Sequence, residues 1–222
     1  MKKIYCLLED RSGVIWIGTH NSGLWKYSPK QLYGVVSSKN MGFPSMIVTS
    51  FCGDKDHNLL VGSDGMGLYQ FSSNYKILKH WTNKNGLTSN NILSIATLDK
   101  ETFDLGTWGG GICRVKSSTN EISQLRIQNI PSPTNRCVDV LPLQNGEFWV
   151  ATGGDGLYHC GQDGTWNRRP LLINEKADEW MSKVVEGKDN AVWVISSTTL
   201  WRVERQSSKY MLFTPQRDKE HN

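Results

Sequence analysis

The sequence predicts an all-β fold, a five-bladed β-propeller with four antiparallel strands in each blade, and three observations lead to this prediction. First, one pattern occurs five times in the chain, beginning with residues 13–27. It consists of a run of bulky apolar residues, a Gly-bounded turn and a second apolar run. Second, the residues equivalent to Gly18 are Gly62, Gly106, Ala151 and Ile195, which gives a repeat of 44 or 45 residues. Third, the apolar runs are short and show no helical periodicity. A fixed period of this size is typical of a propeller.

Each repeat is expected to supply four strands, which in the first repeat cover roughly residues 4–9, 14–18, 23–27 and 32–37. The second strand is apolar on both of its faces, so both faces must be covered by neighbouring sheets. Two columns of equivalent residues face one way: Ile15, Leu59, Phe103, Phe148, Val192, and Ile17, Val61, Leu105, Val150, Val194. The column between them comprises Trp16, Leu60, Asp104, Trp149 and Trp193. For Asp104 we expect a local hydrogen bond or a position toward a thinner blade edge.

Two further columns support packing between blades. A hydroxyl residue ends the second strand in every repeat and is expected to bond a backbone group in the following turn: Thr19, Ser63, Thr107, Thr152 and Ser196. Large aromatic residues occur in the third strand, with Cys113 as the exception, and are expected to form inter-blade core: Trp25, Tyr69, Tyr158 and Trp201.

The chain is expected to be one propeller domain over residues 1–222. The blades are placed at approximately 4–40, 41–84, 85–129, 130–175 and 176–214, with a tail at 215–222. Since each repeat supplies its own four strands in order, ring closure would depend on Ile15 and Trp16 packing against Val192 and Trp193. If that packing fails, the five blades are an open fragment with exposed ends.

Composition and charge narrow the function classes. The 25 basic and 21 acidic residues are intermixed without a Lys/Arg block, so no nucleic-acid partner is expected. The start, "MKKIYCLLEDRSG", has only five consecutive apolar residues, which is too short for a signal-peptide core, and no stretch approaches a membrane span. The chain as written is therefore expected to be cytoplasmic and to contain no membrane segment. The five cysteines match no metal or redox spacing and are expected to be buried.

No catalytic site, cofactor or metal is expected. The five histidines lack metal-ligand spacing, and no Ser-His-Asp or phosphate-loop motif is visible. A glycoside hydrolase on this fold would need two carboxylates across the central channel. The innermost strands offer only Asp139 in mid-strand, which disfavours hydrolysis.

The candidate ligand site lies on the face formed by the loops between the second and third strands and the connections that enter the next blade, around one mouth of the channel. From these loops the sequence nominates eight residues: His20, Asn21, Asp64, Trp108, Asn135, Arg136, Asp155 and Trp180. Trp108, in the Gly-rich turn "TWGGG", could stack on a sugar ring or cover the channel mouth as an apolar plug. Arg136 could pair with a carboxylate or sulfate of a ligand, or bridge neighbouring blades.

Residues "LLEDRSGVIWIGTHNSGLWKY" (7–27) resemble the two-component regulator propeller repeat, and "NKNGLTSNNILSI" (83–95) resembles the family's inter-blade segment. The resemblance fades in the fifth repeat, where "WVISSTTLW" lacks both glycines. It implies a sensory input domain of membrane-bound hybrid histidine kinases of the Bacteroidetes type, periplasmic in location. The implied partners are oligosaccharides or other small ligands, together with other domains of a sensor kinase or a second propeller. Two alternatives stay open, a protein-interaction scaffold and an incomplete fragment of a larger propeller sensor.

Overall fold

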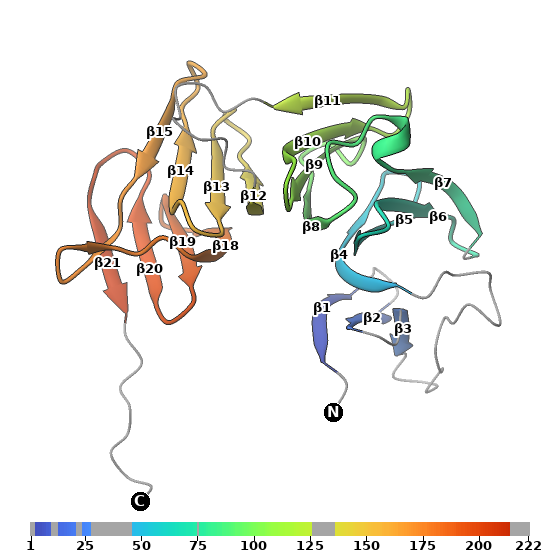
Figure 1. Cartoon of the computed structure of the whole chain (residues 1–222), viewed down its shortest axis with the longest axis horizontal. Helices are drawn as coiled ribbons and strands as arrows, with labels where there is room; N and C mark the ends of the chain where they lie inside the picture. The colour runs from blue at the N-terminus through green and yellow to red at the C-terminus, as the bar shows by residue number, and fades with distance from the viewer. Residues whose placement is uncertain are drawn as a thin grey trace, which may run out of the picture.

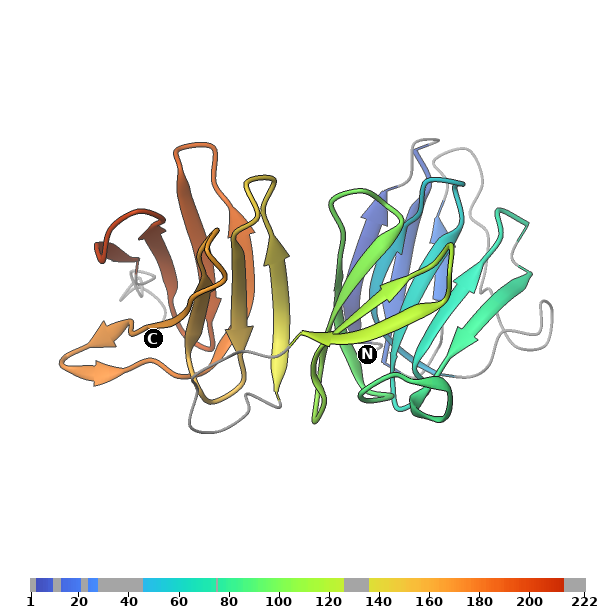
Figure 2. The same ribbon diagram turned by 90° about the horizontal axis from the view of Figure 1, so that it is seen from above.

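A computed structural model describes residues 3–9, 13–20, 24–27, 46–74, 76–125 and 136–213. These residues form five antiparallel sheets that follow one another around an arc as the blades of a β-propeller (Figure 1). Turned by 90°, the sheets stand side by side with their strands running roughly across the ring plane (Figure 2). The all-β class and the five blades predicted from the repeat are confirmed.

The strands follow the chain order within every blade. The first two sheets contain β1 (Ile4–Glu9), β2 (Ile15–Thr19) and β3 (Leu24–Tyr27), then β4 (Ile47–Gly53), β5 (Leu59–Asp64), β6 (Leu68–Phe71) and β7 (Ile77–Trp81). The third contains β8 (Ile92–Ala96), β9 (Thr102–Thr107), β10 (Gly111–Lys116) and β11 (Glu121–Leu125). The last two contain β12 (Cys137–Pro142), β13 (Phe148–Thr152), β14 (Leu157–Cys160) and β15 (Trp166–Arg169), then β18 (Met181–Glu186), β19 (Ala191–Ser196), β20 (Leu200–Glu204) and β21 (Tyr210–Phe213).

Three details complete the element order. The strand expected at 32–37 lies outside the described residues, so the first sheet is described by three strands. A short 3-10 turn, η1 (Asn83–Asn85), connects the second blade to the third. A two-stranded hairpin that the repeat pattern did not predict, β16 (Leu172–Ile173) with β17 (Lys176–Ala177), connects the fourth blade to the fifth.

The innermost strand of every blade contains one extra residue relative to its partner strand. The register shifts between Ile4 and Cys6, and equivalent shifts occur at 48/50, 92/94, 137/139 and 181/183. Such a bulge bends the strand and increases its twist. The same irregularity at the same place in five repeats shows that each blade bends its innermost strand in the same way near the channel.

The Gly column of the second strand lies where the next blade approaches most closely. A Cβ added at Gly62 would meet the Ser50 hydroxyl and lie 2.8 Å from Ile92 Cγ2 of the following blade. At Gly18 it would meet the Cys6 thiol and lie 3.0 Å from Val48 Cγ1, again in the following blade. Sterics of the blade interface therefore explain why the repeat carries Gly at this position.

The hydrophobic core is divided among the spaces between blades. Four clusters lie between successive sheets, and the two largest fully buried side chains are Trp149 and Trp201. Tyr69, Tyr158 and Trp201 of the third-strand column are buried in these clusters, which confirms their prediction as inter-blade core. Trp25 belongs to the same column but is only partly buried, because it lies on the face of the first blade against which no other blade packs in the described part of the chain.

Polar side chains inside the blades have local partners. The hydroxyls of Ser63, Thr107 and Thr152 donate to backbone carbonyls of Gly67, Gly111 and Gly156, as the hydroxyl column predicts. Asp104 is buried and accepts two hydrogen bonds from Arg114, at 2.7 and 3.0 Å. A paired charge thus replaces the Trp or Leu of the other repeats, as the expectation of a local hydrogen bond for Asp104 proposed.

The innermost strands of successive blades lie side by side: β1 with β4, β4 with β8, β8 with β12, and β12 with β18. Among the described residues no comparable contact joins β1 to β18. Trp16 and Val192 both pack into interior cores, against the second and the fourth blade respectively. Of the four residues expected at the ring closure, Trp16 and Val192 therefore do not meet, because strand alternation turns both toward existing neighbours.

Gly62→Ala is predicted to destabilise the fold by about 1–3 kcal/mol, because its methyl group overpacks the interface with Ile92. The matched control is Gly53→Ala, where an added Cβ meets nothing within 4 Å. Urea unfolding of both variants measures the difference, and equal stabilities would contradict the steric role of the Gly column.

Candidate functional site

The loops nominated from sequence gather at one end of the blades through a repeated backbone contact. The residue after each second strand donates its N–H to the residue before the innermost strand of the same blade. Trp108 N bonds Asn91 O at 2.9 Å, Gly153 N bonds Arg136 O at 3.0 Å, and Ser197 N bonds Trp180 O at 3.2 Å. This contact fixes Trp108, Arg136 and Trp180 at the same end of the channel, on three successive blades.

Two tryptophan rings converge on Gly153. A Cβ built there would lie 3.4 Å from Trp108 Cζ3, 3.4 Å from Trp180 Cζ3 and 3.3 Å from Val138 Cγ2. The two tryptophans are 40% and 52% exposed, so their rings flank the glycine while part of each remains open to solvent. We call Trp108, Arg136, Val138, Gly153 and Trp180 the mouth cluster.

Arg136 is part of the mouth cluster through Trp108. Its guanidinium carbon lies 4.8 Å from the centroid of the Trp108 ring, and the two residues form an antiparallel backbone bridge. A guanidinium over an indole is a cation–π contact, which holds the ring and keeps the charge beside it. Arg136 therefore bridges two blades, as one of its two expectations proposed, and its positive charge lies at the aromatic surface.

The other nominated residues have different surroundings. His20 stacks on Tyr5 in the first blade with centroids 5.7 Å apart, and Asp64 is exposed at the end of β5. The backbone of Asp155 accepts a hydrogen bond from Arg168, which also pairs with Glu179 at 3.0 Å. Asn21 and Asn135 lie outside the described residues. Sequence reasoning missed Val138 and Gly153, which only the bulge and the blade geometry bring to the rings.

The innermost strands hold an ion pair between the exposed Lys183 and a buried carboxylate. Asp139 is buried, and its carboxylate lies 3.1 Å from Lys183 Nζ and accepts the N–H of Val184 at 2.9 Å. Burial raises the pKa of Asp139, and the Lys183 charge and the Val184 hydrogen bond oppose this increase. The carboxylate that the sequence offered for hydrolysis is thus engaged in joining the fourth blade to the fifth.

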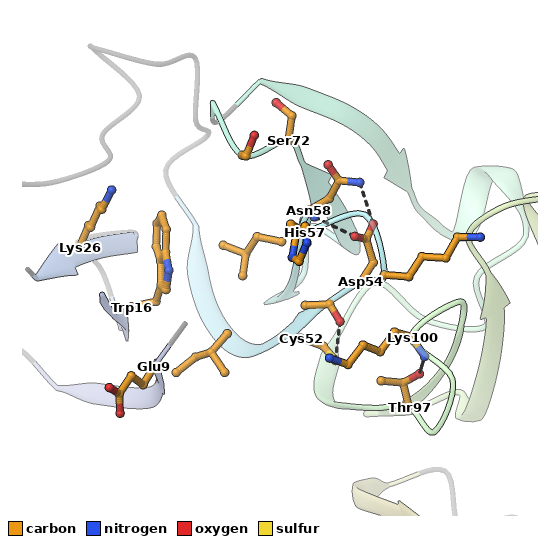
Figure 3. A pocket seen from close by; sticks show the side chains of 15 residues that line it. Glu9, Trp16, Lys26, Cys52, Asp54, His57, Asn58, Ser72, Thr97 and Lys100 are labelled. Atoms are coloured by element: carbon orange, nitrogen blue, oxygen red, sulfur yellow. Dashed lines mark hydrogen bonds between the residues drawn. The ribbon is translucent and has the colours of Figure 1, made fainter. Parts of the chain in front are cut away.

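A pocket of about 810 Å³ opens at the other end of the blades (Figure 3). It lies between the first and second blades, where Trp16, Lys26 and Leu59 line it, and it extends to Thr97 and Lys100 of the third blade. Its apolar walls end in a mostly basic rim that includes Lys55 and His57. No pattern in the sequence indicated this pocket, because its residues come from the turns opposite the nominated loops.

The cysteine thiols are held in the protonated form. Burial raises the pKa of Cys52, which lines the pocket, to about 11, and that of Cys6 to about 12. A thiol with so high a pKa carries almost no thiolate at neutral pH and is a poor nucleophile. Cys52 therefore contributes apolar surface to the pocket rather than reactivity.

The comparison with protein families gives one match. Residues 2–21 match the family model described as the two component regulator propeller. The matched segment contains β1 and β2 and overlaps residues 7–27, which carry the resemblance in the sequence. No curated protein matches the chain.

Solved structures with the same fold include extracellular domains from B. thetaiotaomicron. One, described as that of a hybrid two component system (BT3049), is 21% identical with a TM-score of 0.77, and the match covers 96% of this chain and 29% of that one. Another, described as that of a one component system (BT4673), is 17% identical with a TM-score of 0.74, covering 96% and 30%. The chain spans about 30% of the length of these structures.

A third similar structure is the WD40 β-propeller domain of Doa1, 17% identical with a TM-score of 0.65, where the match covers 87% of this chain and 60% of that one. The TM-scores show that this chain shares the fold of these three structures. In the described part of the chain, no helix is long and apolar enough to cross a membrane.

Lys183→Met is predicted to destabilise the protein by about 1–3 kcal/mol at pH 7, since it leaves the buried Asp139 carboxylate without its cation. Because the pKa of Asp139 is raised in the folded state, its contribution to stability is lost as the pH rises through that pKa. The destabilisation by Lys183→Met should therefore shrink toward pH 5, where Asp139 takes up a proton. Urea unfolding at pH 7 and pH 5 measures this difference in the free energy of unfolding. The exposed Lys176→Met is the control, and a pH-independent penalty for Lys183→Met would contradict the pairing.

Proposed function

We propose that this propeller is a non-enzymatic sensory module that binds a small ligand, an oligosaccharide, at the mouth cluster. The proposal depends on one observation: the rings of Trp108 and Trp180 flank Gly153 and remain partly exposed. A tryptophan committed only to the core would be buried, as Trp149 and Trp201 are. Partly exposed indoles beside a residue without a side chain leave a shallow apolar surface of the kind on which a sugar ring stacks.

The charge at this surface favours an acidic sugar. The Arg136 guanidinium lies over Trp108, and a guanidinium can bind a carboxylate or sulfate through two parallel hydrogen bonds. Two acidic residues, Asp155 and Glu179, lie on the same side of the blades. Arg168 pairs with the Glu179 carboxylate and donates a hydrogen bond to the backbone of Asp155. An anionic group is therefore expected next to Arg136, with the sugar ring against the tryptophans.

The setting that we propose follows the relatives. The B. thetaiotaomicron structures are described as extracellular domains of regulatory systems, and this chain shares their fold over nearly its whole length. We propose a periplasmic or extracellular location, with the ligand signal passed to other domains of a sensor protein. Buried thiols with raised pKa values would resist oxidation in that compartment.

The two competing functions make different use of the same surfaces. A glycoside hydrolase would need Asp139 free to face a second carboxylate, whereas it is paired with Lys183. A pure interaction scaffold would use the exposed sheet faces at the two ends of the arc and would leave the mouth cluster without a ligand.

Thermal unfolding of the purified chain with neutral, carboxylated and sulfated oligosaccharides tests the proposed function. A ligand that binds only the folded state at 100 times its Kd adds about 2.7 kcal/mol of stability. We expect the largest increase in Tm with an acidic sugar, an increase that Trp108→Ala and Trp180→Ala abolish. Arg136→Gln should remove the preference for acidic over neutral sugars.

Two control variants locate the binding. Trp193→Ala removes a tryptophan from the fifth blade outside the mouth cluster, and Lys100→Ala alters the rim of the opposite pocket. Neither is expected to change the ligand-induced shift. A shift lost in Lys100→Ala but retained in Trp108→Ala would move the site to the pocket, and no shift across the panel would contradict oligosaccharide binding and favour the scaffold.

A further inference from the structure

The pocket at the other end of the blades combines apolar walls with basic side chains from three blades. Leu8 and Trp16 line it from the first blade, and Leu59 lines it from the second. Its volume of about 810 Å³ is within the range of sites that bind small molecules, which are mostly apolar with a few well-placed polar groups. The mouth cluster lies at the opposite end of the blades, so the pocket is a separate site.

Three lysines line the pocket, one from each of the first three blades: Lys26, Lys55 and Lys100. The Nζ of Lys55 lies 2.7 Å from the Glu101 carboxylate, so its charge is already paired. Lys26 lines the pocket at one side and Lys100 lines it at the other (Figure 3). Burial raises the pKa of Cys52, and the Lys100 charge opposes this rise, so that charge acts on the interior of the pocket.

The two acidic residues of the lining do not offset the three lysines. The Asp54 carboxylate is buried and accepts hydrogen bonds from the side chains of Asn58 and Gln70, at 2.8 and 2.6 Å. Glu9, the other acidic residue, is exposed at the end of β1. The charge of the pocket is therefore complemented by a ligand that carries an anionic group.

Two basic residues of the lining occupy backbone positions that favour glycine. His57 has a φ of 63° in the turn between β4 and β5, where the equivalent residues of other blades are Gly13, Gly146 and Asn190. Lys100 has a φ of 60° in the turn between β8 and β9. This left-handed region is costly for most residues that have a Cβ. Such positions cluster at ligand sites, where the side chain has a function that offsets the cost.

We propose that this pocket binds an organic carboxylate with an apolar body, such as an aromatic acid, as a second ligand of the propeller. The apolar body lies against Trp16 and Leu59, which removes it from water. The carboxylate pairs with Lys100, while Lys26 adds positive charge at the other side and His57 donates a hydrogen bond. Sugars carry hydroxyl groups over most of their surface, so the apolar walls select against them and keep the two ligand classes apart.

Isothermal titration calorimetry of the full chain with naphthoate tests the proposal. Naphthalenemethanol and naphthylmethylammonium carry the same rings with a neutral and a cationic group, and both should bind more weakly than the acid. Lys100→Gln should lower the naphthoate affinity about fivefold, which corresponds to about 1 kcal/mol, and should leave the affinity for the alcohol nearly unchanged. His57→Gly should also weaken naphthoate binding without lowering Tm, because glycine adopts the positive φ without strain.

Two control variants locate the binding. Met211→Gln changes an exposed apolar residue on the fifth blade, and Trp108→Ala removes a ring of the mouth cluster. Both should keep the naphthoate affinity within about twofold, since neither residue lines the pocket. A loss of affinity in either control with none in Lys100→Gln would place the ligand elsewhere and overturn the proposal. Equal affinities for the acid, the alcohol and the cation, or no detectable binding of naphthoate, would overturn it as well.

Discussion

The close approach of neighbouring blades at the second strand is the constraint on which the rest of this structure depends. Gly18, Gly62 and Gly106 leave room for an innermost strand of the next blade, and an added methyl group at Gly62 would meet atoms of both Ser50 and Ile92. The apolar columns on either side can then meet without voids, which gives four separate inter-blade cores instead of one central core. Interiors packed at this density tolerate little change in volume. Ile195 stands in this column on the fifth blade and is 44% exposed.

The same inter-blade geometry produces the mouth cluster. In each of three successive blades, a backbone hydrogen bond joins the residue after the second strand to the residue before the innermost strand. These contacts bring Trp108, Arg136 and Trp180 to one end of the channel. The bulge in β12 directs Val138 toward the same point, and Gly153 leaves the space between the rings unfilled. A rigid scaffold that presents a few side chains from several repeats suits ligand recognition, because the repeats fix the geometry while single residues differ between blades.

Buried charges are placed where they join elements rather than where they could react. Arg114 satisfies Asp104 within the third blade, and Lys183 satisfies Asp139 across the fourth and fifth. The carboxylates of Asp104 and Asp139 are buried, so loss of either cation would leave a charge in a region of low polarity. The thiols of Cys6 and Cys52 are likewise unreactive, since burial keeps them protonated. The chemistry of the interior thus contributes to stability and leaves recognition to the exposed loops.

The sequence by itself determined the five-bladed fold, because a 44-residue period with apolar residues on both faces of the second strand has few other solutions. It also nominated Trp108, Arg136 and Trp180, since aromatic and basic residues in loops stand outside the repeating columns. It could not show that these three converge on Gly153, because the distances depend on the bulges and on the rotation between blades. Nor could it show the opposite pocket, the β16–β17 hairpin or the exposed end faces. Whether a core-type residue is covered depends on which sheet lies beside it, and only the tertiary structure decides that for Ile4 and Ile195.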